Sequence, residues 1–390
     1  MTIGREEIIR GLRSFDDLTT LRRSGFFAEH SRAVDSILAV PQVFHSTTAA
    51  PLLRSFTRVV QWNIEKGVRF DTLLESLREH DVLKWADVLL INEADSGMNR
   101  SGNRHVARDL AAALGMNMAY GAAYLELTKG TGAELTTPGE NRESLQGNAV
   151  LSRHPILEAA VVPLPQCFEP YEFSEKRYGR RCCIWARLRI GGGRELWAGS
   201  THLEVRNTPA CRARQMRHLL ANLPAGAGEA AMLGGDLNTS GFRRGTALRT
   251  LASLWRLVGR PPEGVKEELR HPERGSEPLF REARKAGFFW EGLNPDRDTA
   301  SVPLAGLEDA GSIPRWLASV LQRRLAPYEG CLRLKLDWLM GRGVQPLRAG
   351  EVRDADAGAG SLDPGCILTE RVAEDRISDH SPIHADFRVI

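Results

Sequence analysis

The order of strand-like and helix-like segments predicts an α/β fold. Short apolar runs, typical of buried strands, are mixed with amphipathic segments, typical of helices, from about residue 57 to the C-terminus. The composition, 42% hydrophobic and 26% charged over 390 residues, is that of a globular protein with a sizeable core. We therefore expect one large α/β domain.

The first 50 residues carry helical patterns and no residues that suggest chemistry, so we expect residues 1–50 to form an N-terminal helical extension. Its helical segments are 8–15, 16–27 and 30–44. The main domain is then expected over residues 51–390. It contains an elaborated, mainly helical or irregular insert at about 243–330, with helices over 278–287 and 313–325.

Within the main domain, the predicted strands cover 57–64, 87–93, 119–127, 148–152, 182–190, 195–203, 230–236, 331–343 and 383–389. The predicted helices cover 70–85, 103–115 and 208–223, and a long loop covers 128–147. The near-continuous apolar run at 87–93 indicates a central strand covered on both faces. Gly115 is a suitable helix end, and Thr208 followed by Pro209 is a suitable helix start.

The charge and the cysteines restrict the classes of function. A net charge of +3 gives no support for a dominant nucleic-acid-binding surface, although arginine clusters at 177–181 and 212–217 could form a local one. The six cysteines lack the CxxC spacing of zinc sites, and Cys182 and Cys183 should point to opposite faces of a strand. Without a signal-like N-terminus or an apolar run of about 18 residues, we expect a reduced, cytoplasmic protein.

Polar residues stand at the ends of several predicted strands. They are Asn63, Glu93, His202, Asp236 with Asn238, Asp337, and the pair Asp379 and His380. Each of them alone is more often a cap or a turn former. As an ordered set, they supply carboxylates that can hold a cation and histidines that can move a proton near neutral pH.

The motifs around these residues resemble the endonuclease/exonuclease/phosphatase superfamily, the metal-dependent phosphodiesterases related to DNase I. The chain carries, in that family's order, QWNIEKG, LLINEAD, GNAVLSRHPI, STHLEV, GGDLN, LKLDWL and SDHSPI, from about Arg58 to Ile390. The resemblance implies a four-layer α/β sandwich, with two mixed sheets packed face to face and helices outside. Its active site would lie at one edge of the sheets.

The resemblance also implies a metal site. Glu93 would be the main ligand of Mg²⁺, with Mn²⁺ as an alternative, and Asn63 and Asp379 would stand close to the metal or its waters. This fits the chemistry, because a hard cation prefers carboxylate and water oxygens and can polarise a phosphoryl oxygen. Glu65 could supply a second metal site, although a solvated loop residue is the more common meaning.

The remaining residues would act on the water and the phosphate. His380, oriented by Asp337, would bind the phosphate or serve as the base, and Asp236 would activate or orient the attacking water. Asn238 would fix that water or a phosphate oxygen. His202 matches a histidine of the DNase, sphingomyelinase and tyrosyl-DNA phosphodiesterase-like branches. The sequence leaves open whether Asp236 or His380 takes the proton.

Four further residues lie near the motifs. His105 and His154 are expected to be surface or turn histidines. Asn148 either supports the substrate or a neighbouring loop, or makes a purely structural hydrogen bond. Arg181 either reaches a substrate phosphate or forms a salt bridge.

The substrate is a phosphoester, with a nuclease-like phosphodiesterase as the favoured subtype and nucleic acid as a candidate partner. A lipid or inositol phosphate phosphodiesterase, similar to a sphingomyelinase, is the alternative, because fold and metal site do not fix the substrate. A non-catalytic binding protein on the same scaffold is the alternative of another class.

Overall fold

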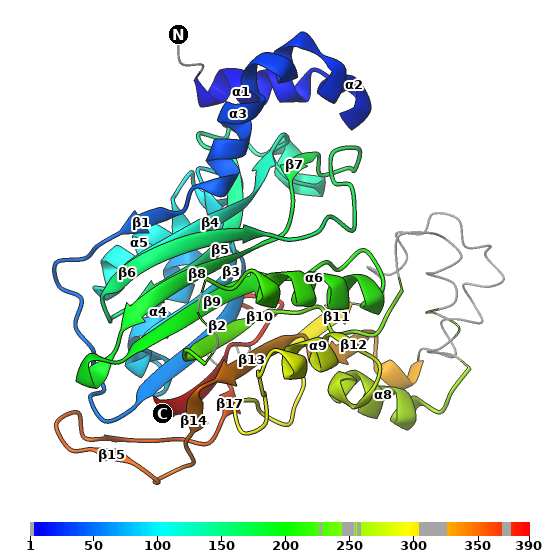
Figure 1. Cartoon of the computed structure of the whole chain (residues 1–390). Coiled ribbons are helices and arrows are strands. Elements are labelled where there is room, and N and C mark those ends of the chain that lie inside the picture. Colours follow the sequence, from blue (N-terminus) through cyan, green and yellow to red (C-terminus); the bar gives the residue numbers. More distant parts are fainter. Residues whose placement is uncertain are drawn as a thin grey trace.

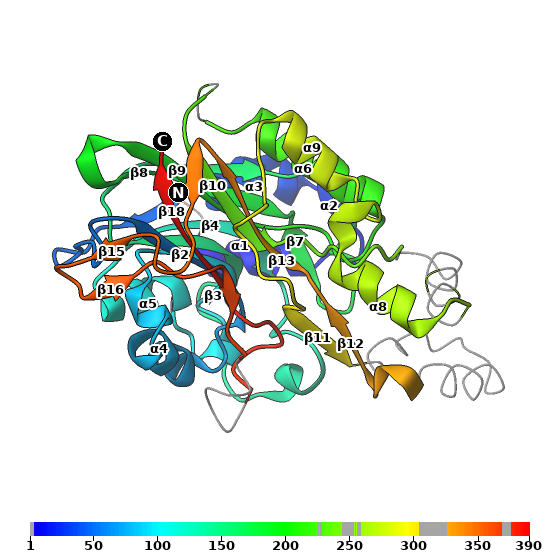
Figure 2. The same cartoon turned by 90° about the horizontal axis from the view of Figure 1, so that it is seen from below.

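The computed structural model of the protein describes residues 4–224, 226, 228–243, 253, 255, 259–303, 326–368 and 376–390. Two β-sheets pack face to face and helices cover their outer faces (Figures 1 and 2). The core between the sheets contains apolar side chains of both, such as Leu90 and Val150 from one sheet and Ile184 and Leu339 from the other. The predicted four-layer α/β sandwich with two mixed sheets is confirmed.

The larger sheet has nine strands in mixed directions. Its main path runs β1 (Gln42–Phe44), β4 (Asn117–Glu126), β5 (Leu145–Ser152), β3 (Val88–Ser96), β2 (Thr57–Lys66), β18 (Ile383–Val389) and β14 (Val344–Pro346). β7 (Arg177–Gly179) pairs with β4, and β17 (Gly365–Cys366) pairs with β18. β2 and β3 are parallel, so their carboxyl ends lie at the same edge of the sheet.

The smaller sheet has five strands, in the order β13 (Asp337–Arg342), β10 (Ala231–Asp236), β9 (Glu195–His202), β8 (Cys182–Arg189) and β6 (Ile156–Pro163). β9 and β10 are parallel and the other pairs are antiparallel. Two short ladders stand outside both sheets: β11 (Ala300–Pro303) with β12 (Cys331–Leu334), and β15 (Arg353–Asp354) with β16 (Ala359–Gly360).

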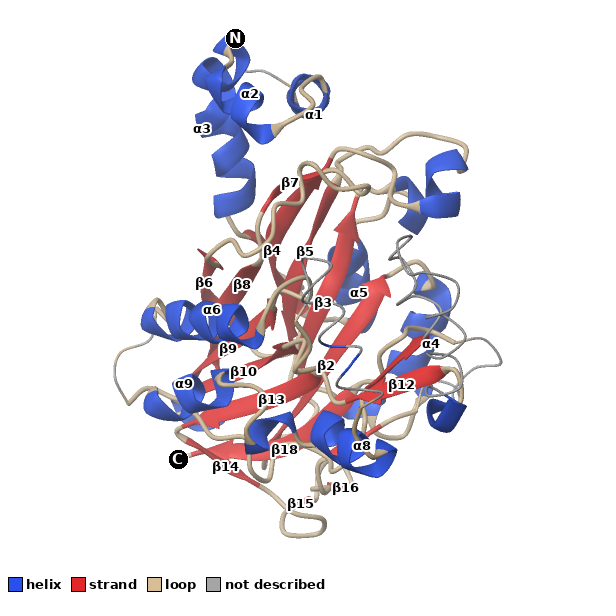
Figure 3. Cartoon of the chain, turned by 90° about the vertical axis from the view of Figure 1, so that its right-hand side faces the viewer, coloured by secondary structure: helices blue, strands red, loops and turns tan. Residues whose placement is uncertain are grey.

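Helices form the two outer layers because each buries one apolar face. α4 (Phe70–Glu79) and α5 (Val106–Leu114) pack on the larger sheet through side chains such as Leu73 and Leu110. α6 (Pro209–Ala221) and α9 (Leu279–Lys285) cover the smaller sheet through Met216 and Phe280. α8 (Pro262–Arg270) packs beside β12, as Figure 3 shows. Short 3-10 turns are Leu83–Trp85, Asn99–Ser101, Gly132–Thr136, Gly191–Gly193, Pro272–Arg274 and Ala326–Tyr328.

Two of the predicted helix ends are observed. Gly115 follows α5 with φ 62°, and Thr208 caps α6 by accepting a hydrogen bond from the Cys211 amide. The helix predicted over 278–287 corresponds to α9. The helix predicted over 313–325 lies outside the described residues.

The N-terminal segment forms α1 (Arg5–Arg13), α2 (Leu18–Arg23) and α3 (Gly25–Ala39), at the top of Figure 1. The prediction of helix through residue 44 is wrong for Gln42–Phe44, because these residues pair with β4 as an edge strand. Local periodicity does not reveal such a pairing, which depends on a partner far along the chain. The boundary at residue 50 stays a prediction.

The structure corrects one expectation about the cysteines. Cys167 and Cys211 form a disulfide, so these two are not the reduced thiols that the sequence led us to expect. Cys182 and Cys183 are buried in different apolar clusters, as predicted for neighbours on one strand. Among the described residues, no helix is long and apolar enough to cross a membrane.

Candidate active site

The polar residues predicted at strand ends converge at one edge of the sandwich. Asn63 and Glu93 lie near the carboxyl ends of the parallel strands β2 and β3. His202 and Asp236 end β9 and β10 and are register partners. Asp337 begins β13, directly opposite Asp236. The two sheets thus bring to one place residues that are widely separated in the sequence.

Glu93 owes its position to an irregularity in β3. The strand's register shifts around Glu93, which has a φ of 56°. Such a backbone is uncommon for a residue other than glycine, and it is kept where the surroundings enforce it. Glu93 Oε1 lies 3.3 Å from Asn63 Nδ2 and 3.6 Å from His202 Nδ1, while the side chain stays 24% exposed. The carboxylate is therefore held but not enclosed.

Asp236 contacts side chains from both sheets. Its Oδ2 lies 3.2 Å from Asn63 Nδ2, 3.2 Å from His202 Nε2 and 3.6 Å from His380 Nε2. Burial raises the pKa of Asp236 to about 7; the nearby His380 opposes this rise, whereas Asp337 adds to it. A carboxyl group with this pKa can exchange a proton near neutral pH.

His380 and Asp337 form a buried pair. His380 Nδ1 lies 2.7 Å from Asp337 Oδ2, which also accepts a 2.7 Å hydrogen bond from Thr299 Oγ1. Gln61 Nε2 donates to the other oxygen at 3.0 Å. Burial acts to lower the pKa of His380, but the carboxylates of Asp337, Asp236 and Asp379 raise it well above its usual value. The ring is thus fixed in place and favours the protonated form.

The loop that carries Asp379 and His380 is anchored from both sides. Ser378 Oγ donates to the Asn63 carbonyl at 2.7 Å, and Trp62 Nε1 donates to the His380 carbonyl at 3.1 Å. On the other side, the Ser381 amide donates to the Thr299 carbonyl at 2.7 Å. These bonds fix the loop against β2 and against the start of β11.

Asn238 and His202 complete the site. The Asn238 amide N–H donates to Asp236 Oδ1 at 2.9 Å, and its side-chain Nδ2 donates to the Leu203 carbonyl at 2.9 Å. Burial lowers the pKa of His202 well below its usual value, and Arg181 and His380 lower it further. His202 is therefore a neutral imidazole between Glu93 and Asp236.

Sequence reasoning missed the residues that hold this site together: Gln61, Asn92, Thr299 and Ser378. Asn92 Oδ1 accepts hydrogen bonds from the Asp236 amide at 2.7 Å and from Gln61 Nε2 at 3.2 Å. Its Nδ2 donates to Asn148 Oδ1 at 3.0 Å. A buried amide inside the apolar run at 87–93 was the available signal, because buried polar groups require partners.

Asn148 and the two histidines near the motifs have structural partners or surroundings. Asn148 also donates to the Cys182 carbonyl at 2.9 Å, so it joins β5 to β8. His105 caps α5 by accepting from the Arg108 amide at 3.3 Å. His105 and His154 are buried, with 6% and 3% exposure, so neither is a surface residue; His154 does lie in a turn, as predicted.

Arg181 and Glu65 lie at the periphery of the site. No carboxylate of the described residues lies within ion-pair distance of Arg181, and its buried Nε has no hydrogen-bond partner there. Burial and the nearby Asp379 raise the pKa of Glu65, whereas Arg69 lowers it. Glu65 Oε2 lies 3.7 Å from Arg69, and its side chain is 43% exposed.

Two groups of residues could hold a cation. Ligand atoms of Asp236, Asp337 and His380 lie within 4.8 Å of one another, but Asp337 already accepts three hydrogen bonds, from Gln61, Thr299 and His380. Glu93 and Asp379 instead offer oxygens in a half-buried position, with Asn63 beside Glu93. Oxygen donors of this kind fit a hard divalent cation.

Comparisons with known proteins bear on this geometry. A sequence model described as "Endonuclease/Exonuclease/phosphatase family" matches residues 60–380. A search of curated protein sequences finds no match.

Several solved structures resemble the chain at low identity. An endonuclease/exonuclease/phosphatase from Beutenbergia cavernae is 17% identical, with a TM-score of 0.47, over 86% of this chain and 72% of that one. The human Nocturnin catalytic domain with bound sulfate is 16% identical, with a TM-score of 0.47, over 90% and 98%. A 3'-5' exonuclease from Neisseria meningitidis is 15% identical, with a TM-score of 0.44, over 85% and 99%.

Proposed function

The chain belongs to the endonuclease/exonuclease/phosphatase family, whose members are generally phosphoester hydrolases, and from this premise we propose that it is a divalent-metal-dependent phosphodiesterase. The observation that carries the proposal is the half-open carboxylate of Glu93, next to Asn63 and at the same edge as Asp236 and His202. Hydrolysis of a phosphodiester needs this combination, because the site must neutralise charge and align a water with the leaving oxygen.

Glu93 is proposed as the main ligand of the metal ion, with Asn63 and Asp379 beside it. Mg²⁺ is the expected ion and Mn²⁺ an alternative, because the donor set consists of oxygens. When bound, the ion would polarise a phosphoryl oxygen and offset negative charge. Besides burial, the charges of Asp379 and Glu93 raise the pKa of Glu65, so Glu65 lies near the proposed metal ligands. This supports Glu65 as a candidate ligand of a second metal ion.

The protein's own residues supply the proton chemistry. We assign the proton acceptor to Asp236, because its Oδ2 is where the Asn63, His202 and His380 side chains converge and because its pKa lies near 7. His380, held by Asp337 and favouring the protonated form, would donate a hydrogen bond to a phosphoryl oxygen.

Two further residues position these groups. As a neutral ring, His202 has a single N–H, and it would orient Asp236, whose Oδ2 lies 3.2 Å from Nε2, because Glu93 Oε1 is farther from Nδ1 at 3.6 Å. The Asn238 Nδ2 donates one of its two N–H groups to the Leu203 carbonyl, so its Oδ1 and its second N–H would be available to fix a water or a phosphate oxygen.

A nuclease-like activity is the favoured subtype, and a lipid or inositol phosphate phosphodiesterase is the alternative. A non-catalytic binding protein is the hypothesis of another class. It is disfavoured because the acidic and histidine positions that hydrolysis needs are filled and lie within contact distance of one another.

The domain organisation and the location are proposals as well. We propose residues 51–390 as the catalytic domain, with residues 1–50 as an extension and an insert at about 243–330. A cytoplasmic location is the prediction from the sequence. The Cys167–Cys211 disulfide argues against it, because the cytosol usually keeps thiols reduced.

The test is a panel of phosphoesters assayed with Mg²⁺, with Mn²⁺ and with EDTA. The panel contains bis(4-nitrophenyl) phosphate, single- and double-stranded DNA, RNA, sphingomyelin and inositol phosphates. We expect hydrolysis that EDTA abolishes and that added Mg²⁺ restores. Activity confined to lipid or inositol phosphates would remove the nuclease subtype, and a wild-type protein inactive on the whole panel would favour the binding protein.

A further inference from the structure

A pocket of about 430 Å³ opens beside Ser378 and Asp379, next to the candidate active site. Its other walls come from the end of α8, from the segment before β11 and from the β11–β12 ladder. Arginines from all of these elements line it: Arg270, Arg297, Arg333 and Arg376. The β11–β12 ladder lies beside α8 and outside both main sheets, as Figures 2 and 3 show.

Ser301 ties this pocket to the loop of the candidate active site. Its amide donates to the Asp379 carbonyl at 3.3 Å, and its carbonyl accepts from Arg376 Nη2 at 3.2 Å. Across the β11–β12 ladder, Ser301 is the register partner of Arg333. A ligand in the pocket would therefore lie next to Asp379.

Four arginines and three aspartates, Asp296, Asp298 and Asp379, line the pocket, so positive charge is in slight excess. Arg270 pairs with Asp298 at 3.5 Å, which offsets the charge of that arginine. Arg376 is instead anchored by neutral groups, the carbonyls of Ser378 at 3.0 Å and of Ser301 at 3.2 Å, which fix its guanidinium without cancelling its charge. Within the described part of the chain, Arg297, Arg333 and Arg376 form no ion pair with a carboxylate.

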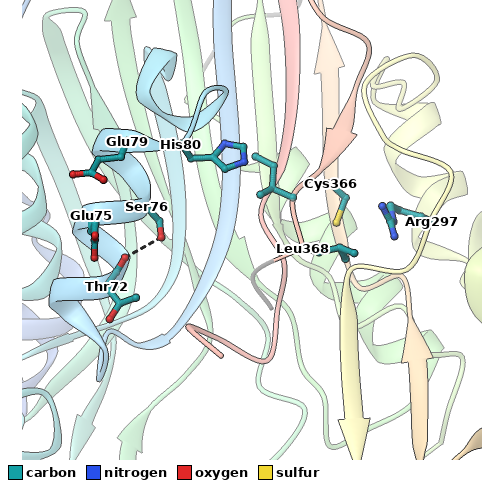
Figure 4. Close-up of a pocket in the computed structure, with 9 residues that line it drawn as sticks. Thr72, Glu75, Ser76, Glu79, His80, Arg297, Cys366 and Leu368 are labelled. Carbon is teal, nitrogen blue, oxygen red and sulfur yellow. Dashed lines mark hydrogen bonds between the residues drawn. The ribbon is translucent and has the colours of Figure 1, made fainter. Parts of the chain in front are cut away.

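A neighbouring cavity of about 520 Å³ has the opposite character. Glu75 and Glu79 of α4 line one side of it, and Arg297 lies on the other side (Figure 4). In this second cavity the carboxylates outnumber the single arginine, whereas in the first the arginines outnumber the carboxylates, so an anion is favoured in the first. Arg297 lines both cavities and therefore lies between the glutamates of α4 and the other arginines of the first pocket.

We propose that the arginine-lined pocket binds a phosphate group of the substrate other than the one that is cleaved, through Arg297, Arg333 and Arg376. This inference rests on the proposed function and narrows its substrate to molecules with at least two phosphates. Guanidinium groups match phosphate oxygens in geometry and charge, and one anchored arginine lowers the entropy cost of binding. The second phosphate could belong to a nucleic acid strand or to a small polyphosphate.

Binding in the presence of EDTA tests this without turnover. Fluorescence anisotropy follows a labelled single-stranded DNA, and calorimetry follows inorganic tripolyphosphate. Arg297→Gln and Arg333→Gln are each expected to weaken binding about tenfold, and to lower the salt dependence of DNA binding by about one ion. Arg54→Gln is the matched control, because Arg54 is 78% exposed, pairs with the exposed Asp356 and does not line the pocket.

The outcomes distinguish a nucleic acid strand from a small polyphosphate as the source of the second phosphate, and they test the subsite separately from the proposed function. A loss for DNA alone supports the subsite with a strand as its source, and a loss for tripolyphosphate supports a small polyphosphate as a sufficient ligand. Unchanged binding of both ligands in both variants, or no binding by the wild type, overturns the subsite. Hydrolysis of bis(4-nitrophenyl) phosphate, which has one phosphate, is assayed in parallel. If the wild type does not hydrolyse this compound but the arginine variants still bind DNA or tripolyphosphate more weakly, the proposed function fails and the subsite stands.

Discussion

Strand β3 contributes to two buried charged clusters that differ in kind. Glu93 belongs to the candidate active site, and Asp95, two residues later, belongs to a cluster around Arg100. Asp95 holds Arg100 through both oxygens, at 3.0 and 2.8 Å, and is fully buried. Glu93 faces an amide and a neutral histidine and stays 24% exposed.

The Arg100 cluster consists of seven residues: Lys66, Asp95, Arg100, Glu126, Glu134, Glu175 and Arg177. Burial raises the pKa of Glu126 to about 8, so at neutral pH this carboxyl is largely protonated. The two arginines and Lys66 then face the carboxylates of Asp95, Glu134 and Glu175, and the charges balance. Such a cluster has a structural role, because breaking it would leave a buried charge without a partner.

The candidate active site has no such balance. Among the described residues, the carboxyl groups of Glu93, Asp236, Asp337 and Asp379 face His380 as a cation and the more distant Arg181, while the neutral His202 adds no charge. An excess of carboxylates over cations among the described residues suits an external cation. Buried charge alone therefore does not indicate a functional site. In this protein the candidate active site is distinguished by accessible ligand atoms and by an excess of negative charge.

The largest effect is expected from replacing the open carboxylate. Glu93→Gln should lower kcat for a phosphodiester on the order of a thousandfold, because it removes charge from the proposed metal ligand. Asp95→Asn is the matched control on the same strand and should keep kcat within about twofold per folded molecule. Steady-state kinetics on proteins of verified folding give both values. Equal losses of kcat in the two variants would break the distinction between the clusters.

Arg100→Met should act on stability instead. It removes the partner of Asp95 and Glu175 and should lower the free energy of unfolding by about 3–5 kcal/mol. Urea denaturation followed by circular dichroism measures this change. A loss of less than about 1 kcal/mol, the range of exposed ion pairs, would contradict the structural role of the Arg100 cluster.

Glu126→Gln tests the charge balance through pH. The folded pKa of about 8 lies above the ordinary value of 4.5, so folded wild-type protein keeps a proton that the unfolded chain releases. The stability from this group is present below about pH 4.5 and is lost as the pH rises towards 8. The wild type should therefore lose about 1.4 kcal/mol per pH unit relative to Glu126→Gln between about pH 5 and 7. Parallel stability profiles would show that Glu126 is ionised in the folded protein.

The smallest effect is expected from Thr299→Val, which removes the hydroxyl that donates to Asp337 Oδ2 at 2.7 Å. One such hydrogen bond to a charged group is worth about 1.5–3 kcal/mol, so kcat should fall about tenfold or more as His380 loses its orientation. Thr299→Ser keeps the hydroxyl and should restore kcat and the pH profile. If Thr299→Ser is as impaired as Thr299→Val, the hydroxyl is not the cause.

The strand and helix pattern predicted an α/β domain, because strand runs are local signals, and the sandwich followed from the resemblance of the ordered motifs to a known family. Asn63, Glu93, Asp236 and His380 stand where converging strand ends were expected. The sequence could not predict Thr299, which reaches Asp337 only because the end of the insert pairs with the loop at residues 379–381. The edge strand Gln42–Phe44 and the disulfide likewise depend on distant partners.

The most direct measurement of the central claim is the binding of Mn²⁺ to metal-free protein, followed by electron paramagnetic resonance. If Glu93 faces a cation site and Asp95 does not, the wild type and Asp95→Asn should bind Mn²⁺ and Glu93→Gln should bind it at least about tenfold more weakly. Undiminished binding by Glu93→Gln would contradict the account.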